Sequence, residues 1–74
     1  IRFSISERGN TKLMVYDISG KVIKKLLSDF LVPGSYSLQW GGDDEWGRMV
    51  SSGIYIYTLT SGSLFQTKKM FLVK

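Results

Sequence analysis

Hydrophobic residues alternate with polar ones in several short stretches of the chain, which is the pattern of strands that bury one face. The alternation is clearest at residues 36–40, where tyrosine, leucine and tryptophan are separated by serine and glutamine, and it also marks residues 1–5. Residues 12–16 are apolar on both faces, which indicates a strand in the interior of a sheet. A long apolar and aromatic strand is expected at residues 53–60, and the final strand at residues 64–73.

Residues 21–27 are ambiguous, because their apolar positions also fit helical spacing. β-Branched residues directly after a turn at Asp17–Gly20 favour a strand, and we expect one there. The other expected features are turns at Glu7–Asn10, Val32–Gly34 and Ser61–Ser63, and a short edge piece at residues 48–50. About seven short strands at roughly ten-residue spacing predict an all-β fold, an immunoglobulin-like antiparallel β-sandwich.

Composition limits the chain to one small domain. Its 74 residues form a single module, residues 1–74, that buries only ~60–65% of its unfolded surface. Without cysteine, the core must come from apolar bulk, and the residues expected in the core or in its tight turns are Trp40, Tyr55, Tyr57, Gly20, Gly42, Gly47 and Gly53. No apolar run approaches the ~18 residues of a membrane helix, so membrane insertion is not expected. The chain opens in a strand without an initiator Met, so we expect that it was cut from a longer polypeptide.

The chain offers no candidate catalytic residue. Histidine, the commonest general base, is absent, and nothing else is placed to activate a serine. Glycosidase chemistry needs two carboxyl groups held ~5–9 Å apart across a cleft, for which a sandwich of this size has little room. A calcium ion would use Asp43, Asp44 and Glu45, with or without Asp17, but their spacing is not that of a calcium loop and a solvated turn is the simpler interpretation. We therefore predict no enzyme activity, no metal and no cofactor.

Charge and aromatic residues narrow the choice of partners. The net charge is +4, yet the lysines are scattered over several expected strands, whereas nucleic-acid-binding proteins gather basic residues on one face. No nucleic-acid partner is predicted. Trp46 lies in a loop and is the aromatic residue available to stack on a sugar ring, since the other large aromatic residues fall on regular strand faces. Carbohydrate binding is a secondary hypothesis.

A series of motifs along the whole chain resembles one family. They are Val15-Tyr-Asp-x-x-Gly-Lys-Val22, Pro33-Gly-x-Tyr36, Trp40-x-Gly42-x-Asp44-x-x-Gly47-x-x-Val50-x-Ser-Gly53-x-Tyr55-x-Tyr57-x-Leu59 and Thr67-Lys-Lys-Met-x-Leu-Val-Lys74. In this order the motifs resemble the immunoglobulin-like domain of the flagellar hook-capping protein FlgD and its relatives, the C-terminal sorting domains of the type IX secretion system. The chain departs from the family pattern at Gly41, where Asp or Asn is frequent.

The resemblance implies a non-catalytic C-terminal module for the secretion, sorting and cell-surface attachment of a larger exported bacterial protein. Its partner would be the secretion machinery, and its location secreted or on the cell surface, outside the Gram-negative outer membrane. The implied sorting residues are those of the terminal strand, Lys68, Lys69, Met70, Leu72 and Lys74. Independently, a terminal strand can form a sheet edge whose unpaired N–H and C=O groups bind a partner. Both faces of this strand are apolar, so we expect one face to leave an exposed strip.

Two other functions are left open by the sequence. One is an accessory domain that packs beside a hydrolase, with or without weak glycan binding. The other is a structural subunit whose edges pair with neighbouring copies, giving a homo-oligomer, a fibre or a cap. In both cases an edge strand would contact a neighbouring domain or protomer instead of an export receptor.

Overall fold

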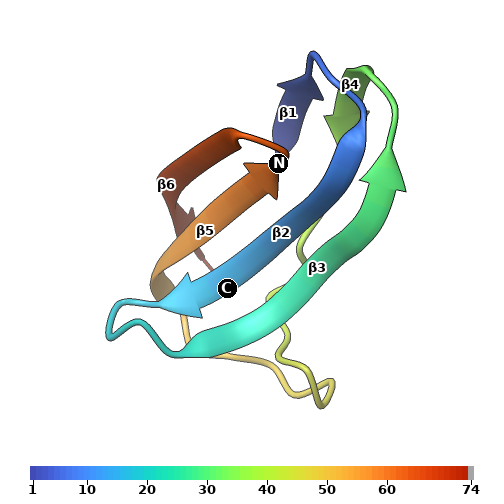
Figure 1. Cartoon of the computed structure of the whole chain (residues 1–74). Coiled ribbons are helices and arrows are strands. Elements are labelled where there is room, and N and C mark those ends of the chain that lie inside the picture. The colour runs from blue at the N-terminus through green and yellow to red at the C-terminus, as the bar shows by residue number, and fades with distance from the viewer. Residues whose placement is uncertain (74) are drawn as a thin grey trace.

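The computed structural model describes residues 1–73, which form two antiparallel β-sheets (Figure 1). The strands are β1 (Arg2–Ile5), β2 (Gly9–Asp17), β3 (Val22–Leu31), β4 (Gly34–Ser37), β5 (Gly53–Ser61) and β6 (Leu64–Leu72). β3, β2, β5 and β6 form the large sheet in that order, and β1 pairs with β4 in a small one. The all-β sandwich is confirmed, with six strands rather than about seven, because the piece expected at residues 48–50 makes only an isolated bridge. The described residues contain no helix that is long and apolar enough to cross a membrane.

The hydrophobic core lies where the small sheet covers one end of the large sheet. Leu13 of β2 and Leu59 of β5 are paired across the strands and are 0% and 1% exposed. Phe3 and Ile5 project from β1 onto them, and the Phe3 ring stacks on Tyr36 of β4 at a centroid distance of 5.5 Å. Figure 1 shows β1 and β4 gathered at one end of the long strands, so another segment must cover the rest of this face.

The prediction that residues 12–16 form an interior strand is confirmed by β2, which pairs with β3 on one side and with β5 on the other. The face that looks into the sandwich also carries a polar pair, Thr11 and Ser61. Their hydroxyl oxygens lie 2.8 Å apart in a buried position, so one hydroxyl donates to the other and neither buried polar group lacks a partner.

The strand expected at residues 21–27 is confirmed as β3, which continues to Leu31. Its pairing with β2 shifts register twice, between Leu13 and Met14 and between Val15 and Tyr16. These irregularities place Lys24 opposite Val15, whose side chain is fully buried in the sandwich. This register lets the Lys24 side chain reach Asp43 in the loop that follows β4.

The long connection between β4 and β5 covers the second half of the inner face. The strand expected to reach residue 40 ends at Ser37, although the backbone of Leu38 still exchanges hydrogen bonds with Ile1 at 2.8 and 2.6 Å. The half-buried Trp40 packs edge-on against Tyr55 at a centroid distance of 5.0 Å. Its indole N–H donates a 2.9 Å hydrogen bond to the carbonyl of Asp43, which fixes the start of the loop.

Candidate functional site

The terminal strand β6 forms one edge of the large sheet. It pairs with β5 without interruption, from Ser61 opposite Leu64 to Gly53 opposite Leu72. No hydrogen bond joins its other side to any described part of the chain. β6 therefore presents a regular row of unpaired backbone N–H and C=O groups, which is a template for an additional strand. In Figure 1, β6 lies at the side of the sheet opposite β3.

The two faces of β6 differ in exposure. Met70 and Leu72 are half-buried on the face that pairs with Tyr55 and Gly53, whereas Phe65 and Phe71 are 66% and 76% exposed. Val73, just beyond the strand, is 85% exposed. Exposed apolar side chains thus lie near both ends of the unpaired edge, Phe65 at one end and Phe71 with Val73 at the other, and such exposed apolar surface is typical of interaction sites.

The lysines of the implied sorting strand are accessible. Lys68 and Lys69 are exposed on opposite faces of β6, and neither forms an ion pair with a described residue. Lys74 lies outside the described residues. Two positive charges in the middle of an open edge favour a partner strand that carries acidic side chains.

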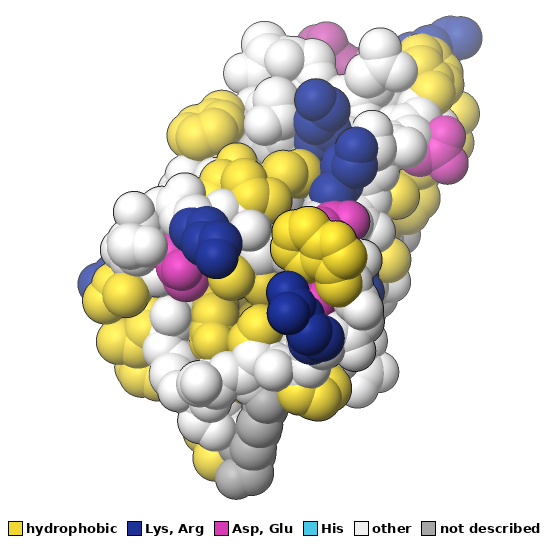
Figure 2. Space-filling model, turned by 90° about the horizontal axis from the view of Figure 1, so that it is seen from below, with side chains coloured by type: hydrophobic (Ala, Val, Ile, Leu, Met, Phe, Trp, Pro, Cys, Tyr) yellow, Lys and Arg dark blue, Asp and Glu magenta, His cyan; other side chains and the backbone are white. Residues whose placement is uncertain are grey.

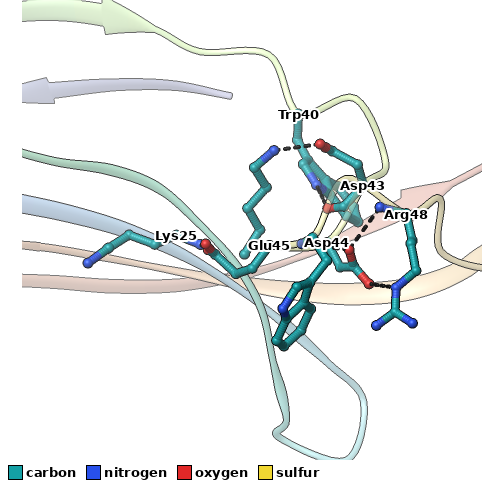
Figure 3. A network of polar contacts seen from close by, with 8 residues as sticks. Lys25, Trp40, Asp43, Asp44, Glu45 and Arg48 are labelled. Atoms are coloured by element: carbon teal, nitrogen blue, oxygen red, sulfur yellow. Dashed lines mark hydrogen bonds and ion pairs between the residues drawn. The ribbon is translucent and has the colours of Figure 1, made fainter.

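The opposite edge of the large sheet is protected near its start, at Ile23 and Lys25. The backbone N–H of Glu45 donates a 3.1 Å hydrogen bond to the carbonyl of Ile23, and the Glu45 carboxylate accepts one from the N–H of Lys25 (Figure 3). One loop residue thus satisfies two outward-facing groups of β3, in the way an added strand would. β1 and β4 each extend over only four residues, so β6 is the longest unprotected edge that the structure describes.

The three acidic side chains that would have bound calcium point to different partners. Asp43 forms a 2.5 Å ion pair with Lys24, Asp44 binds within its own turn, and Glu45 binds the edge of β3. Figure 3 shows these carboxylates directed to separate groups. Among residues 1–73, no group of three or more Asp, Glu, His or Cys side chains is arranged to hold a metal ion.

Asp44 organises the tip of a small hairpin. Its Oδ1 accepts hydrogen bonds from the backbone N–H groups of Trp46 and Arg48, both at 2.9 Å. Hydrogen bonds from these backbone groups, with the nearby Arg48 charge, hold the pKa of the Asp44 carboxyl below its usual range. The carboxylate therefore stays ionised at neutral pH and keeps accepting them. Across the hairpin, the N–H of Val50 donates to the carbonyl of Gly42 at 2.9 Å.

The same turn occurs twice in the chain. Oδ1 of Asp17 accepts from the N–H groups of Ser19 and Lys21, both at 2.9 Å, as Asp44 does at the equivalent offsets. Sequence reasoning identified the first turn, but for the second it predicted only a solvated acidic turn and not this hydrogen-bond pattern. The signal that would have found it is the shared spacing Asp-x-x-Gly followed by a basic residue.

The remaining residues singled out from the sequence lie in the core or at turns. Tyr55 is buried, and Tyr57 is half-buried against the core cluster. The glycines have positive φ angles, at Gly20 (90°), Gly42 (79°), Gly47 (78°) and Gly53 (155°). Trp46, by contrast, is 75% exposed at the tip of the Asp44 hairpin.

Comparisons of the chain with protein-family models, with curated proteins and with solved structures find no match. The site is therefore defined by its geometry: an open terminal edge at β6, an edge at β3 that Glu45 protects at its start, and a hairpin that exposes a tryptophan. A hollow of about 520 Å³ lies over the small sheet, and it is lined by serine, arginine and aromatic side chains without a carboxylate.

Proposed function

We propose that the chain is a non-catalytic, immunoglobulin-like attachment module of a larger exported protein, and that partners bind it by adding a strand to β6. The observation that carries this proposal is the difference between the two edges of the large sheet. Glu45 covers the start of the β3 edge at Ile23 and Lys25, whereas alternate residues along the whole nine-residue length of β6 point backbone groups outward that no described residue pairs. Proteins usually protect a long regular edge, so an edge that is left open is suited to binding.

Strand addition also explains the side chains along β6. Backbone hydrogen bonds to the partner strand would supply affinity, and side chains at alternate positions would set its register. Phe65 and Phe71 provide apolar contacts on the uncovered face, and Lys68 and Lys69 provide positive charge at the centre. The packing of Leu72 under the β4–β5 loop holds the strand in place against the body of the domain.

The resemblance to sorting domains of the type IX secretion system suggests the identity of the partner. On this proposal the secretion machinery at the Gram-negative outer membrane binds β6, and the protein is then secreted or attached to the cell surface. The support is the match of motifs along the sequence together with the open terminal edge.

The same edge supports a second candidate, a structural subunit that pairs with copies of itself. An antiparallel β6–β6 contact would join two large sheets into a continuous one and cover the exposed Phe65 and Phe71. A concentration-dependent dimer of the isolated domain, seen by sedimentation, would favour this candidate over recognition by a separate receptor.

The proposal is tested by reversing charge on β6 without disturbing the fold. Residues 1–74 are fused to a secreted reporter in a host with type IX secretion, and Lys68→Glu/Lys69→Glu is compared with the parent. Both side chains are exposed, so the melting temperature should stay unchanged. We expect the exported reporter to fall at least about tenfold, because like charges would face an acidic partner strand.

The matched control is Arg2→Glu/Lys12→Glu, which makes the same change in net charge at exposed positions of β1 and β2. Export of this control should equal that of the parent. Equal export of all three fusions would contradict the role of β6, and equal loss in both double variants would show that only total charge matters.

A further inference from the structure

The hairpin after β4 exposes a tryptophan in an ordered position. Trp46 is 75% exposed, although indole is among the side chains with the most apolar area to gain from burial. Figure 2 looks at the end of the molecule from which this loop projects, and hydrophobic side chains lie there among lysine and arginine side chains. The backbone beneath the ring is held by the Asp44 carboxylate and by a bridge between Asp43 and Met49. The indole is therefore presented to solvent by a rigid support.

Arg48 lies on one face of this ring. Its guanidinium carbon is 5.5 Å from the ring centroid of Trp46, and its Nε is 3.4 Å from Oδ2 of Asp44 (Figure 3). The Asp44 contact uses the Nε side of the guanidinium and leaves the two terminal nitrogens directed away from it. The side chain is 74% exposed, so this pair of donors is accessible to a ligand. A guanidinium fork held in this way matches the two oxygens of a carboxylate.

We infer that Trp46 and Arg48 form a binding site for an anionic sugar, a pyranose ring that bears a carboxylate. The ring's C–H groups carry partial positive charge and would stack on the negative π-face of the indole that Arg48 leaves uncovered. The carboxylate of the same or the adjoining sugar would accept hydrogen bonds from the terminal nitrogens of Arg48. Asp44 acts on the ligand only through Arg48 and the backbone, as a positioning residue.

A saccharide fits this site better than a protein surface does. Tryptophans that anchor protein interfaces lie in pockets from which surrounding contacts exclude water. Here the residues beside Trp46 on the hairpin, Glu45 and Gly47, are themselves exposed. A ligand about the width of one indole ring suits such a narrow tip.

This site is independent of the function proposed for β6. Glu45 fastens the hairpin to β3, the edge of the sheet opposite β6. Loss of sugar binding should leave export unchanged, and charge reversal at Lys68 and Lys69 should leave sugar binding unchanged. Failure of one proposal is thus distinguishable from failure of the other.

The test uses trigalacturonate as the probe and the indole N–H signals of the ¹⁵N-labelled domain as the readout. The domain has two tryptophans, and the indole N–H of Trp40 is already bonded to Asp43, so Trp40 is an internal reference. We expect trigalacturonate to shift the Trp46 signal saturably and to leave the Trp40 signal in place. The fully methyl-esterified trisaccharide, which keeps the rings and loses the charge, should bind at least about tenfold more weakly.

Variants show whether Trp46 and Arg48 each contact the sugar. Binding to each variant is followed by the chemical shift of the Gly47 backbone amide. Trp46→Ala and Arg48→Gln should each weaken binding about tenfold, while Phe71→Ala, which removes an equally exposed ring from β6, should not change it. Because all three side chains are exposed, the rest of the spectrum should report an intact fold. No shift at millimolar trigalacturonate, equal affinity for the methyl ester, or a shift retained in Trp46→Ala would each overturn the inference.

Discussion

Replacing Leu13 by alanine is expected to lower the free energy of unfolding by about 2–5 kcal/mol. Leu13 is fully buried in the interior strand β2 and faces Leu59 and Leu27 on the two neighbouring strands. Phe3 and Ile5 cover it from the small sheet, so the missing methyl groups would leave a cavity that a two-layer sandwich can close only in part. Natural domains have only ~5–15 kcal/mol of stability in all, so urea denaturation should show a large fall in the midpoint.

The control for this prediction is Phe65→Ala on the uncovered face of β6. It removes a larger side chain, but one that is 66% exposed, so its effect should stay within about 0.5 kcal/mol. If Phe65→Ala were as destabilising as Leu13→Ala, the outer face of the sheet would have to be covered in solution, as it would be in a dimer.

Replacing Gly42 by alanine should cost about 2–5 kcal/mol, for two reasons that add. Gly42 has a φ of +79°, a left-handed conformation that costs a side-chain-bearing residue about 1–2 kcal/mol. In addition, a Cβ atom at this buried position would lie 3.1 and 3.2 Å from the two Cδ atoms of Leu72, which adds about 1–3 kcal/mol of overpacking. Thermal unfolding followed by circular dichroism would measure the loss.

Gly47→Ala separates the two causes. Gly47 has nearly the same φ, +78°, but nothing lies within 4 Å of the Cβ that alanine would add. We expect only the backbone cost, about 1–2 kcal/mol. A Gly42→Ala variant no less stable than Gly47→Ala would mean that the loop does not press on Leu72, and the anchoring of β6 to the body of the domain would then need another explanation.

The strands could be predicted well wherever a local pattern determines them. Two apolar faces at residues 12–16 indicated an interior strand, and the Ser61–Ser63 turn gave the short connection between β5 and β6. The strand expected at residues 21–27 was found, but β3 continues beyond Leu27. Pairing with the first residues of β2 keeps that segment extended as far as Leu31, and this is a tertiary effect.

The limits of sequence reasoning are clearer at the loop after β4. Alternation through Trp40 suggested a strand, but the chain leaves β1 after Leu38 so that the indole can reach Tyr55. The contact of Glu45 with β3 had no sequence signal, because it depends on a carboxylate meeting a backbone N–H twenty residues away in the chain. The exposure of Trp46 followed correctly from its place in a loop, whereas the position of Arg48 against its ring did not.

The central claim is that Glu45 closes the β3 edge at Ile23 and Lys25 whereas the β6 edge is open, and backbone amide hydrogen exchange followed by NMR tests it most directly. We expect the Lys25 amide, which donates to Glu45, to exchange slowly. Along β6, amides directed at β5 should exchange slowly and those directed outward should exchange quickly, in alternation. Uniform protection of every β6 amide, or a Lys25 amide that exchanges as fast as an unbonded one, would contradict it.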